Sequence, residues 1–186
     1  MGVNGLMKFL TKDDPQFFEA VPIQNKVVID GYNIMHRISS CRTNSRVCGG
    51  EYQEIGRQLR AFFEMLLSYE IEPIVIFDGG KEDDKMETTF KRRRNCQETV
   101  KRALSAKGMT NGKEKLTGPL FRSILEELKI KMIMTEFEAD LSMAKFAVEH
   151  DCPILSNDSE FAVFSKVKWI KVRVILFSIK YKIEIS

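Results

Sequence analysis

Residues 137–161, FEADLSMAKFAVEHDCPILSNDSEF, combine a helical apolar pattern, a short apolar run and two pairs of acidic residues. Four apolar residues at helical spacing predict a helix with one buried face, and they are Leu141, Ala144, Ala147 and Val148. The run CPILS at 152–156 is typical of a buried strand. A helix that leads into a buried strand is the repeating unit of a parallel sheet.

Three further apolar runs have the same character as 152–156. They are KVVID at 26–30, PIVIF at 73–77 and KIKMIM at 129–134. Two helical stripes lie between them, one formed by Ile55, Leu59, Phe62, Phe63, Leu66 and Leu67, the other by Leu120, Phe121, Ile124, Leu125 and Leu128. Because strands alternate with helices, we expect an α/β fold with a mainly parallel sheet flanked by helices.

Acidic residues follow each of the four predicted strands. They are Asp30 after the first, Asp78 after the second, Glu136, Glu138 and Asp140 after the third, and Asp158 and Glu160 after the fourth. Parallel strands end at one carboxyl edge, where ligands of open α/β sheets bind. Like charges there repel, and the usual relief is a raised pKa on one member unless a cation lies between them. The pattern therefore predicts a cation site at this edge.

Each acid also has a local structural explanation. These are a capping box at Thr135-x-x-Glu138, the first helical turn for Asp140, a turn or N-cap at Asn157-Asp158-Ser159, and strand-ending turns at Asp30-Gly31 and Asp78-Gly79. The local explanations and the cation site are alternatives that the sequence leaves open.

Carboxylates without histidine or cysteine form a hard oxygen ligand set, which selects Mg²⁺ or Mn²⁺. Two such ions about 4 Å apart activate a water and stabilise the leaving oxygen of a phosphodiester. Competing motifs fit poorly, because residues 108–114 lack the spacing and the Ser/Thr of a P-loop, and the sequence has no nucleophile elbow. Two-metal phosphodiester hydrolysis is therefore the chemistry that this residue set favours.

The composition is that of one domain without a membrane-spanning or secretory pattern. The chain has 186 residues, of which 44% are hydrophobic and 30% charged. Its four cysteines show no CxxC spacing, and MGVNGLMKFL lacks the basic and apolar regions of a signal peptide. No run reaches the roughly 18 apolar residues that a membrane span needs. We expect a protein of the nucleus or the reduced cytosol, with no membrane partner.

Positive charge is concentrated in two places. Residues 91–94 read KRRR, and residues 166–186 carry six Lys or Arg against one Glu. The KRRR run is typical of a solvated helix face, of a nuclear localisation patch and of a surface that contacts phosphates. In the second segment, alternation with charged residues predicts a strand at Ile179, Tyr181, Ile183 and Ile185.

Five motifs, in order, resemble the N-terminal catalytic region of the flap endonuclease superfamily of structure-specific nucleases. They are MGVNGL, VVIDGYNIMHRI, VIFDGG, FEADLSMA and LSNDSEF, and within the superfamily they look most like the asteroid proteins. The resemblance implies a PIN-like α/β nuclease domain over residues 1–164, and it leaves residues 165–186 as an unassigned basic tail. It also implies DNA cleavage with two Mg²⁺ or Mn²⁺ ions, on branched or overhanging DNA, in nuclear or nucleocytoplasmic DNA repair.

The resemblance assigns roles to ten residues. The family's catalytic and metal-binding carboxylates fall on Asp30, Asp78, Glu138, Asp140, Asp158 and Glu160, and Glu136 falls outside the set. Its substrate-contacting positions fall on Gly2, Lys85, Arg92 and Arg93.

The chain departs from the family pattern at two carboxylates. Flap endonucleases usually have Glu-Ala-Glu and Asp-x-Asp, whereas this chain has Glu138-Ala139-Asp140 and Asp158-Ser159-Glu160. Each exchange keeps the carboxylate and changes its reach by one methylene. A shift of about an ångström in metal spacing costs about 100-fold in rate.

Residues 165–186 have no family counterpart, and we expect either the end of a truncated product or a basic edge strand that binds nucleic acid. The leading hypothesis is a Mg²⁺-dependent, structure-specific DNA endonuclease of the asteroid type. The alternative is a catalytically silent PIN-like interaction module, since asteroid proteins are associated with epidermal growth factor receptor signalling. Neither hypothesis identifies a protein partner.

Overall fold

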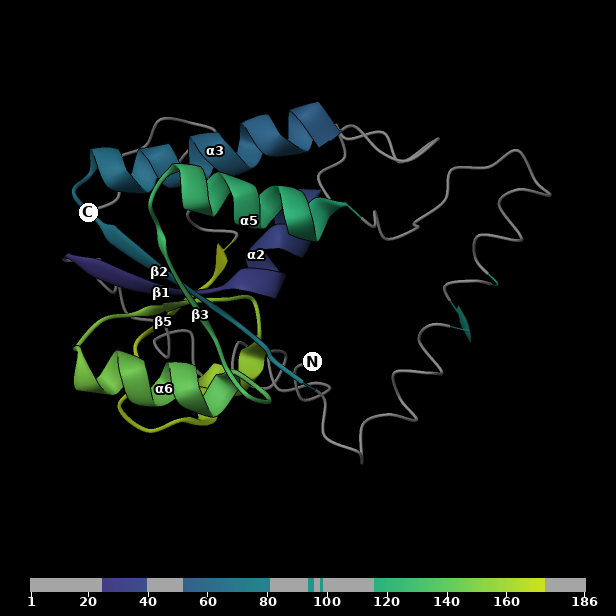
Figure 1. Cartoon of the computed structure of the whole chain (residues 1–186). Helices are drawn as coiled ribbons and strands as arrows, with labels where there is room; N and C mark the ends of the chain where they lie inside the picture. The colour runs from purple at the N-terminus through teal and green to yellow at the C-terminus, as the bar shows by residue number, and fades with distance from the viewer. Residues whose placement is uncertain (1–24, 40–51, 81–93, 96–97, 99–115, 173–186) are drawn as a thin grey trace, which may run out of the picture.

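A five-stranded parallel sheet forms the centre of the protein in this computed structural model, which describes residues 25–39, 52–80, 94–95, 98 and 116–172 (Figure 1). The strands are β1 (Lys26–Asp30), β2 (Glu72–Phe77), β3 (Lys131–Met134), β4 (Ile154–Leu155) and β5 (Trp169–Ile170). Their order across the sheet is β3-β2-β1-β4-β5, and every neighbouring pair runs parallel.

Helices cover both faces of this sheet. They are α2 (Gly31–Ser39), α3 (Tyr52–Ser68), α5 (Thr117–Glu127) and α6 (Asp140–Glu149), and a 3₁₀ helix, η4 (Ser159–Val163), follows β4. Figure 1 shows α3 and α5 on one side of the strands and α6 on the other. The predicted parallel α/β sheet flanked by helices is therefore confirmed. No helix within the described ranges is both long and apolar enough to cross a membrane.

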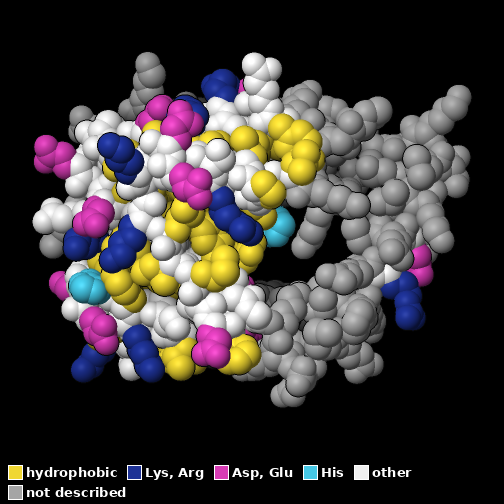
Figure 2. All heavy atoms as spheres, in the orientation of Figure 1, with side chains coloured by type: hydrophobic (Ala, Val, Ile, Leu, Met, Phe, Trp, Pro, Cys, Tyr) yellow, Lys and Arg dark blue, Asp and Glu magenta, His cyan; other side chains and the backbone are white. Residues whose placement is uncertain are grey.

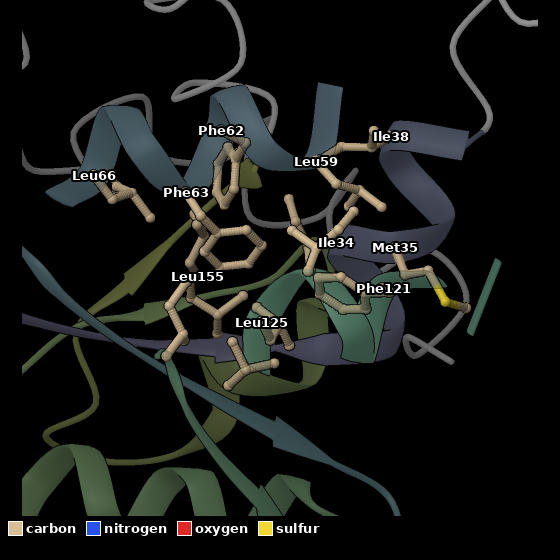
Figure 3. Close-up of a cluster of buried hydrophobic side chains, with 14 of the residues drawn as sticks. Ile34, Met35, Ile38, Leu59, Phe62, Phe63, Leu66, Phe121, Leu125 and Leu155 are labelled. Atoms are coloured by element: carbon tan, nitrogen blue, oxygen red, sulfur yellow. The ribbon is translucent and has the colours of Figure 1, made fainter. Parts of the chain in front are cut away.

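The larger hydrophobic core lies between the sheet and α2, α3 and α5 (Figure 3). Phe63 of α3 and Phe121 of α5 are fully buried, and their ring centroids lie 5.7 Å apart. Phe77 of β2 meets Phe121 edge-on at the same centroid separation of 5.7 Å. Burying one such ring stabilises the fold by about 1.5–3 kcal/mol, so these contacts hold both helices against the strands.

A second, smaller core lies under α6 on the opposite face of the sheet. Met143 and Ala147 of α6 are buried against Val28 of β1 and Ile154 of β4, and Phe161 of η4 is fully buried in the same cluster. Because successive side chains of a strand alternate between faces, Val27 and Ile29 belong to the larger core while Val28 belongs to this one. The central strand is therefore buried on both faces.

The prediction of which α6 residues are buried is partly wrong. Ala144 and Ala147 are buried as expected, but Leu141 is 56% exposed and Val148 is 44% exposed, whereas Met143 is buried. A short helix with small apolar residues has a weak amphipathic pattern, so packing against the sheet decides which face turns inward.

The structure contains three elements that the sequence patterns did not predict, one of which is the 3₁₀ helix η4. Helix α2 begins directly after Asp30, with Ile34, Met35 and Ile38 buried. Strand β5 lies beyond residue 164 and still pairs with β4, while the expected domain division at residue 164 stays a prediction. The strand expected at residues 179–185 lies outside the described residues.

Strand β3 forms one edge of the sheet, pairing only with β2 among the described strands. Figure 2 views the molecule in the orientation of Figure 1, and hydrophobic side chains gather on the surface between α5 and α6. Met134, the last residue of β3, is 57% exposed. The opposite edge of the sheet is formed by β5.

Two glycines after strand ends are required by close packing. A Cβ atom at Gly31 would lie 2.5 Å from the Phe77 ring, and one at Gly79 would lie 1.7 Å from the backbone oxygen of Thr135. The Gly79 amide also donates to the Phe137 carbonyl at 2.8 Å. The backbone after β2 therefore lies against the backbone after β3, with no room for a side chain.

We expect Gly79→Ala to lower the free energy of unfolding by about 1–3 kcal/mol or more, because the contacted backbone must move. Urea unfolding of the full chain measures this change. The matched control is Gly118→Ala in α5, where an added Cβ meets nothing within 4 Å and the helix should gain up to about 1 kcal/mol. Equal effects of the two substitutions would contradict the packing described here.

Candidate metal centre

The strand order creates a topological switch point between β1 and β4. From β1 the chain adds β2 and β3 on one side, whereas β4 and β5 lie on the other side. The crevice outside the carboxyl ends of the strands at such a point is the usual ligand site of open α/β sheets. Asp30 ends β1, and Asp158 follows β4, so two of the predicted acids flank this point.

Asp30 is held by two hydrogen bonds from opposite sides of the switch point. The Asn33 amide of α2 donates to Oδ1 at 2.9 Å, and the Ser156 hydroxyl after β4 donates to Oδ2 at 3.0 Å. Burial raises the pKa of Asp30, and repulsion from Asp78 and Asp158 adds to the rise, while both hydrogen bonds oppose it. The bond from Asn33 shows that Asp30 also caps α2, so a local role and a place in the acidic site coexist.

Asp78 ties the end of β2 to the start of α6. Its Oδ1 accepts a hydrogen bond from the Ala139 amide at 2.8 Å. The Gly80 amide donates to the Glu136 carbonyl, also at 2.8 Å. The segment after β3 is therefore fastened to the segment after β2, and this brings Asp140 toward the same edge.

Asp140 is the first residue of α6 and is partly buried. Burial raises its pKa to about 6, and repulsion from four other acids contributes, namely Asp158, Asp30, Asp78 and Glu160. A helix N-terminus stabilises a carboxylate by about 0.3–1 kcal/mol, which lowers its pKa by less than one unit. Burial and repulsion therefore decide the direction of the shift. Asp140 therefore lies within electrostatic reach of four of the other five predicted carboxylates.

Asp158 caps η4, as the turn or N-cap alternative predicted. Its Oδ1 accepts a hydrogen bond from the Glu160 amide at 3.1 Å. The preceding residue, Asn157, donates from its amide and from Nδ2 to Oδ1 of Asn33, at 3.0 and 3.1 Å. The loop after β4 is thereby fastened to α2 on the other side of the switch point.

Glu138 lies differently from the other five acids. Glu138 and Asp78 are both exposed, but Glu138 alone takes no part in the repulsion that raises the pKa of Asp30 and Asp140. The capping box predicted for Thr135 and Glu138 is wrong, because α6 begins after Ala139 without a side-chain cap. The Thr135 hydroxyl instead lies within hydrogen-bonding distance of the Phe137 carbonyl at 2.7 Å and the Phe77 carbonyl at 3.1 Å, and its one proton is shared between them.

The donor chemistry of the site fits a hard divalent cation, since every charged side chain of the set is a carboxylate. In the part of the chain that the structure describes, no three His, Cys, Asp or Glu side chains lie close enough to share one ion. The acids therefore share an electrostatic environment without forming a closed ligand cage. The predicted substrate contacts Gly2, Lys85, Arg92 and Arg93 lie outside the described residues.

Sequence reasoning missed Asn33 and Ser156, which hold the acids in place. Ser156 is fully buried although it is polar. The available signal was its position, because a serine directly after a buried strand and two residues before an acid can form hydrogen bonds with the ends of neighbouring strands. Asn33 gave a weaker signal because the helix that contains it was not predicted.

Ionisation of Asp140 should cost stability when no cation is bound. The folded protein keeps a proton up to about pH 6 that the unfolded chain releases near its ordinary pKa of 3.8. The unfolding free energy therefore falls as pH rises through this window. We expect Asp140→Asn to gain stability over wild type between pH 4 and pH 7, as measured by urea unfolding in EDTA.

Glu149→Gln, at the exposed end of the same helix, is the matched control for this experiment. It removes one acidic charge without touching the acids at the sheet edge. A stability difference between Asp140→Asn and wild type that stays constant from pH 4 to pH 7 would contradict the expected repulsion.

Comparison with known proteins assigns this chain to a family. The family described as the XPG N-terminal domain matches residues 1–99. The single-strand DNA endonuclease ASTE1 of Mus musculus is 34% identical over 166 residues, which cover 88% of this chain and 25% of that protein. The protein asteroid of Drosophila melanogaster is 30% identical over 172 residues, covering 91% and 20%. The chain thus spans a fifth to a quarter of the length of these curated relatives.

Solved structures show the same fold. The catalytic core of Rad2 in complex with a DNA substrate has a TM-score of 0.60 at 16% identity, covering 91% of this chain and 49% of that chain. Flap endonuclease-1 from Methanococcus jannaschii has a TM-score of 0.56 at 15% identity, covering 82% and 56%. At such identities the likeness shows the fold alone. With the family match over residues 1–99, the chain belongs to the XPG N-terminal domain family, and it is similar to the asteroid proteins within it.

Proposed function

We propose that this chain carries the divalent-metal-dependent catalytic region of a structure-specific DNA endonuclease of the asteroid type. The observation that carries the proposal is the gathering of Asp30, Asp78, Asp140, Asp158 and Glu160 at the carboxyl edge of the sheet, where burial, together with repulsion, raises the pKa of Asp140 to about 6. Perturbed acids at a ligand-binding edge are typical of functional sites. Sequence similarity to a protein named as a DNA endonuclease also supports this proposal.

Mg²⁺ or Mn²⁺ would be held by Asp30, Asp78, Asp140, Asp158 and Glu160, and also by Glu138, which is included on the family resemblance alone. When bound, two such ions supply an activated water and stabilise the leaving oxygen of a phosphodiester. The chain's own contribution is orientation, because hydrogen bonds fix Asp30 from both sides, Asp78 from Ala139 and Asp158 from Glu160. A carboxylate that is already oriented loses less conformational entropy when it binds an ion.

The substrate that we propose is branched or overhanging DNA. The ASTE1 relative of Mus musculus is named a single-strand DNA endonuclease, and the Rad2 core was solved with a DNA substrate. Gly2, Lys85, Arg92 and Arg93 would contact its phosphates. The reaction would take place in the nucleus, in DNA repair.

A second candidate is a PIN-like interaction module that binds partners without cleaving DNA. It is favoured by Asp140 and Glu160, where the chain exchanges the acid that flap endonucleases usually carry. Each exchange moves the carboxylate by one methylene, and misplacement by about an ångström costs about 100-fold in rate. Metal binding and cleavage are therefore tested separately.

We expect Mn²⁺ to stabilise the full chain, by about 2.7 kcal/mol at a concentration one hundred times its Kd. Thermal unfolding with and without Mn²⁺ measures the shift in Tm. Asp30→Asn and Asp158→Asn should each reduce this shift, although either one can raise the Tm without metal by relieving repulsion. The shift is therefore the quantity to compare, and equal shifts in wild type and both variants would rule out the site.

The reaction is tested with end-labelled flap, overhang, hairpin and single-stranded DNA, in Mg²⁺, Mn²⁺ or EDTA. We expect weak cleavage, stronger with Mn²⁺ and absent in EDTA, and we expect Asp158→Asn to reduce its rate by at least about 100-fold. Glu149→Gln should cleave like wild type. A protein that binds Mn²⁺ through Asp158 and cleaves none of the four DNAs would favour the interaction module.

A further inference from the structure

Every hydrogen-bonding group of Ser156 has a partner in this structure. Its hydroxyl donates to Asp30 Oδ2 and accepts from the Asp158 amide, both at 3.0 Å. Its own amide donates to the Ile170 carbonyl at 3.1 Å. Its carbonyl accepts from Trp169 Nε1 at 2.8 Å. Two contacts thus reach the acidic site, and the other two reach β5.

The hydroxyl of Ser156 joins two of the acids across the switch point. One of its hydrogen bonds is to the side chain of Asp30 on β1, and the other is to the backbone amide of Asp158 after β4. Because Ser156 is fully buried, water cannot replace the hydroxyl without entering the core. Removing it would leave a carboxylate oxygen and an amide each short of a partner in a buried place.

Trp169 connects this serine to the outermost strand of the sheet. Strand β5 has two residues and pairs only with β4 among the described strands, so its backbone ladder is short. The indole has one N–H donor, and it donates to the Ser156 carbonyl. The ring also packs against the core under α6, and the Lys171 ammonium lies 5.7 Å from its centroid.

We propose that Ser156 is a positioning residue that sets the relative placement of Asp30 and Asp158, and that β5 holds Ser156 in place through Trp169. The inference rests on the proposed metal site and deepens it. It gives a role to part of the segment beyond residue 164, which none of the five motifs covers. Both residues would act through the carboxylates, because the contacts of Ser156 lead to Asp30 and Asp158.

The test is the Kd of Mn²⁺ for the full chain, measured by titration calorimetry, with the metal-free Tm of each variant recorded alongside. Groups that orient metal ligands typically contribute about 10–100-fold in metal affinity. We expect Ser156→Ala to raise the Kd at least about 10-fold, and Ser156→Thr, which keeps the hydroxyl, to bind more tightly than Ser156→Ala. Trp169→Phe, which keeps an aromatic but smaller ring and loses the donor, should raise the Kd by several fold.

Val167→Ala is the matched control. Val167 packs against the same core under α6, so the variant loses packing near Trp169 without losing the bond to Ser156. Its metal-free Tm should fall while its Kd for Mn²⁺ stays at the wild-type value. If Ser156→Ala does not fold, Trp169→Phe decides the question against this control.

The outcomes separate the inference from the proposed function. If wild type binds Mn²⁺, Asp158→Asn weakens binding, and Trp169→Phe and every folded Ser156 variant bind as tightly as wild type, only the positioning role is overturned. The same conclusion follows if Val167→Ala weakens binding as much as Trp169→Phe, because general loosening would then explain both. If wild type binds no Mn²⁺, the proposed function fails and the positioning role fails with it.

Discussion

The parallel pairing of β1 with β2 on one side and β4 on the other is the constraint on which the acidic site depends. In this register Asp30 pairs with Ile76, and Ile29 pairs with Leu155. The residues that follow, Ser156 after β4 and Asp78 after β2, therefore emerge beside Asp30. Since β1 is buried on both faces, a shift of register would displace the core and the site together.

The acids have local structural roles and also repel one another. Asp30 caps α2 and Asp158 caps η4, so these two side chains would be well placed in any protein of this shape. Local roles do not explain why Asp140 is partly buried beside four other acids, with its pKa raised to about 6. An uncompensated cost of this kind is typical of sites that bind a ligand of opposite charge.

The hydrogen bonds that hold the acids reach well beyond the acids themselves. Asn33 binds Asn157 across the switch point, and Ser156 connects Asp30 to β5 through Trp169. The backbone at Gly79 and the indole of Trp169 both belong to segments that position a carboxylate. The family match ends at residue 99, whereas the site that we describe draws on residues up to Trp169.

The sequence by itself determined the four strands from residue 26 to 155, the stripes of α3 and α5, and the gathering of acids at one sheet edge, because each depends on periodicity or on the common direction of parallel strands. It could not determine α2, which is short, or β5, whose two residues carry no pattern. The sequence by itself also could not determine which face of α6 is buried, or the hydrogen bonds of Ser156 and Trp169. These depend on contacts between residues far apart in the chain, such as Ser156 with Asp30, and only the packed sheet brings those residues together.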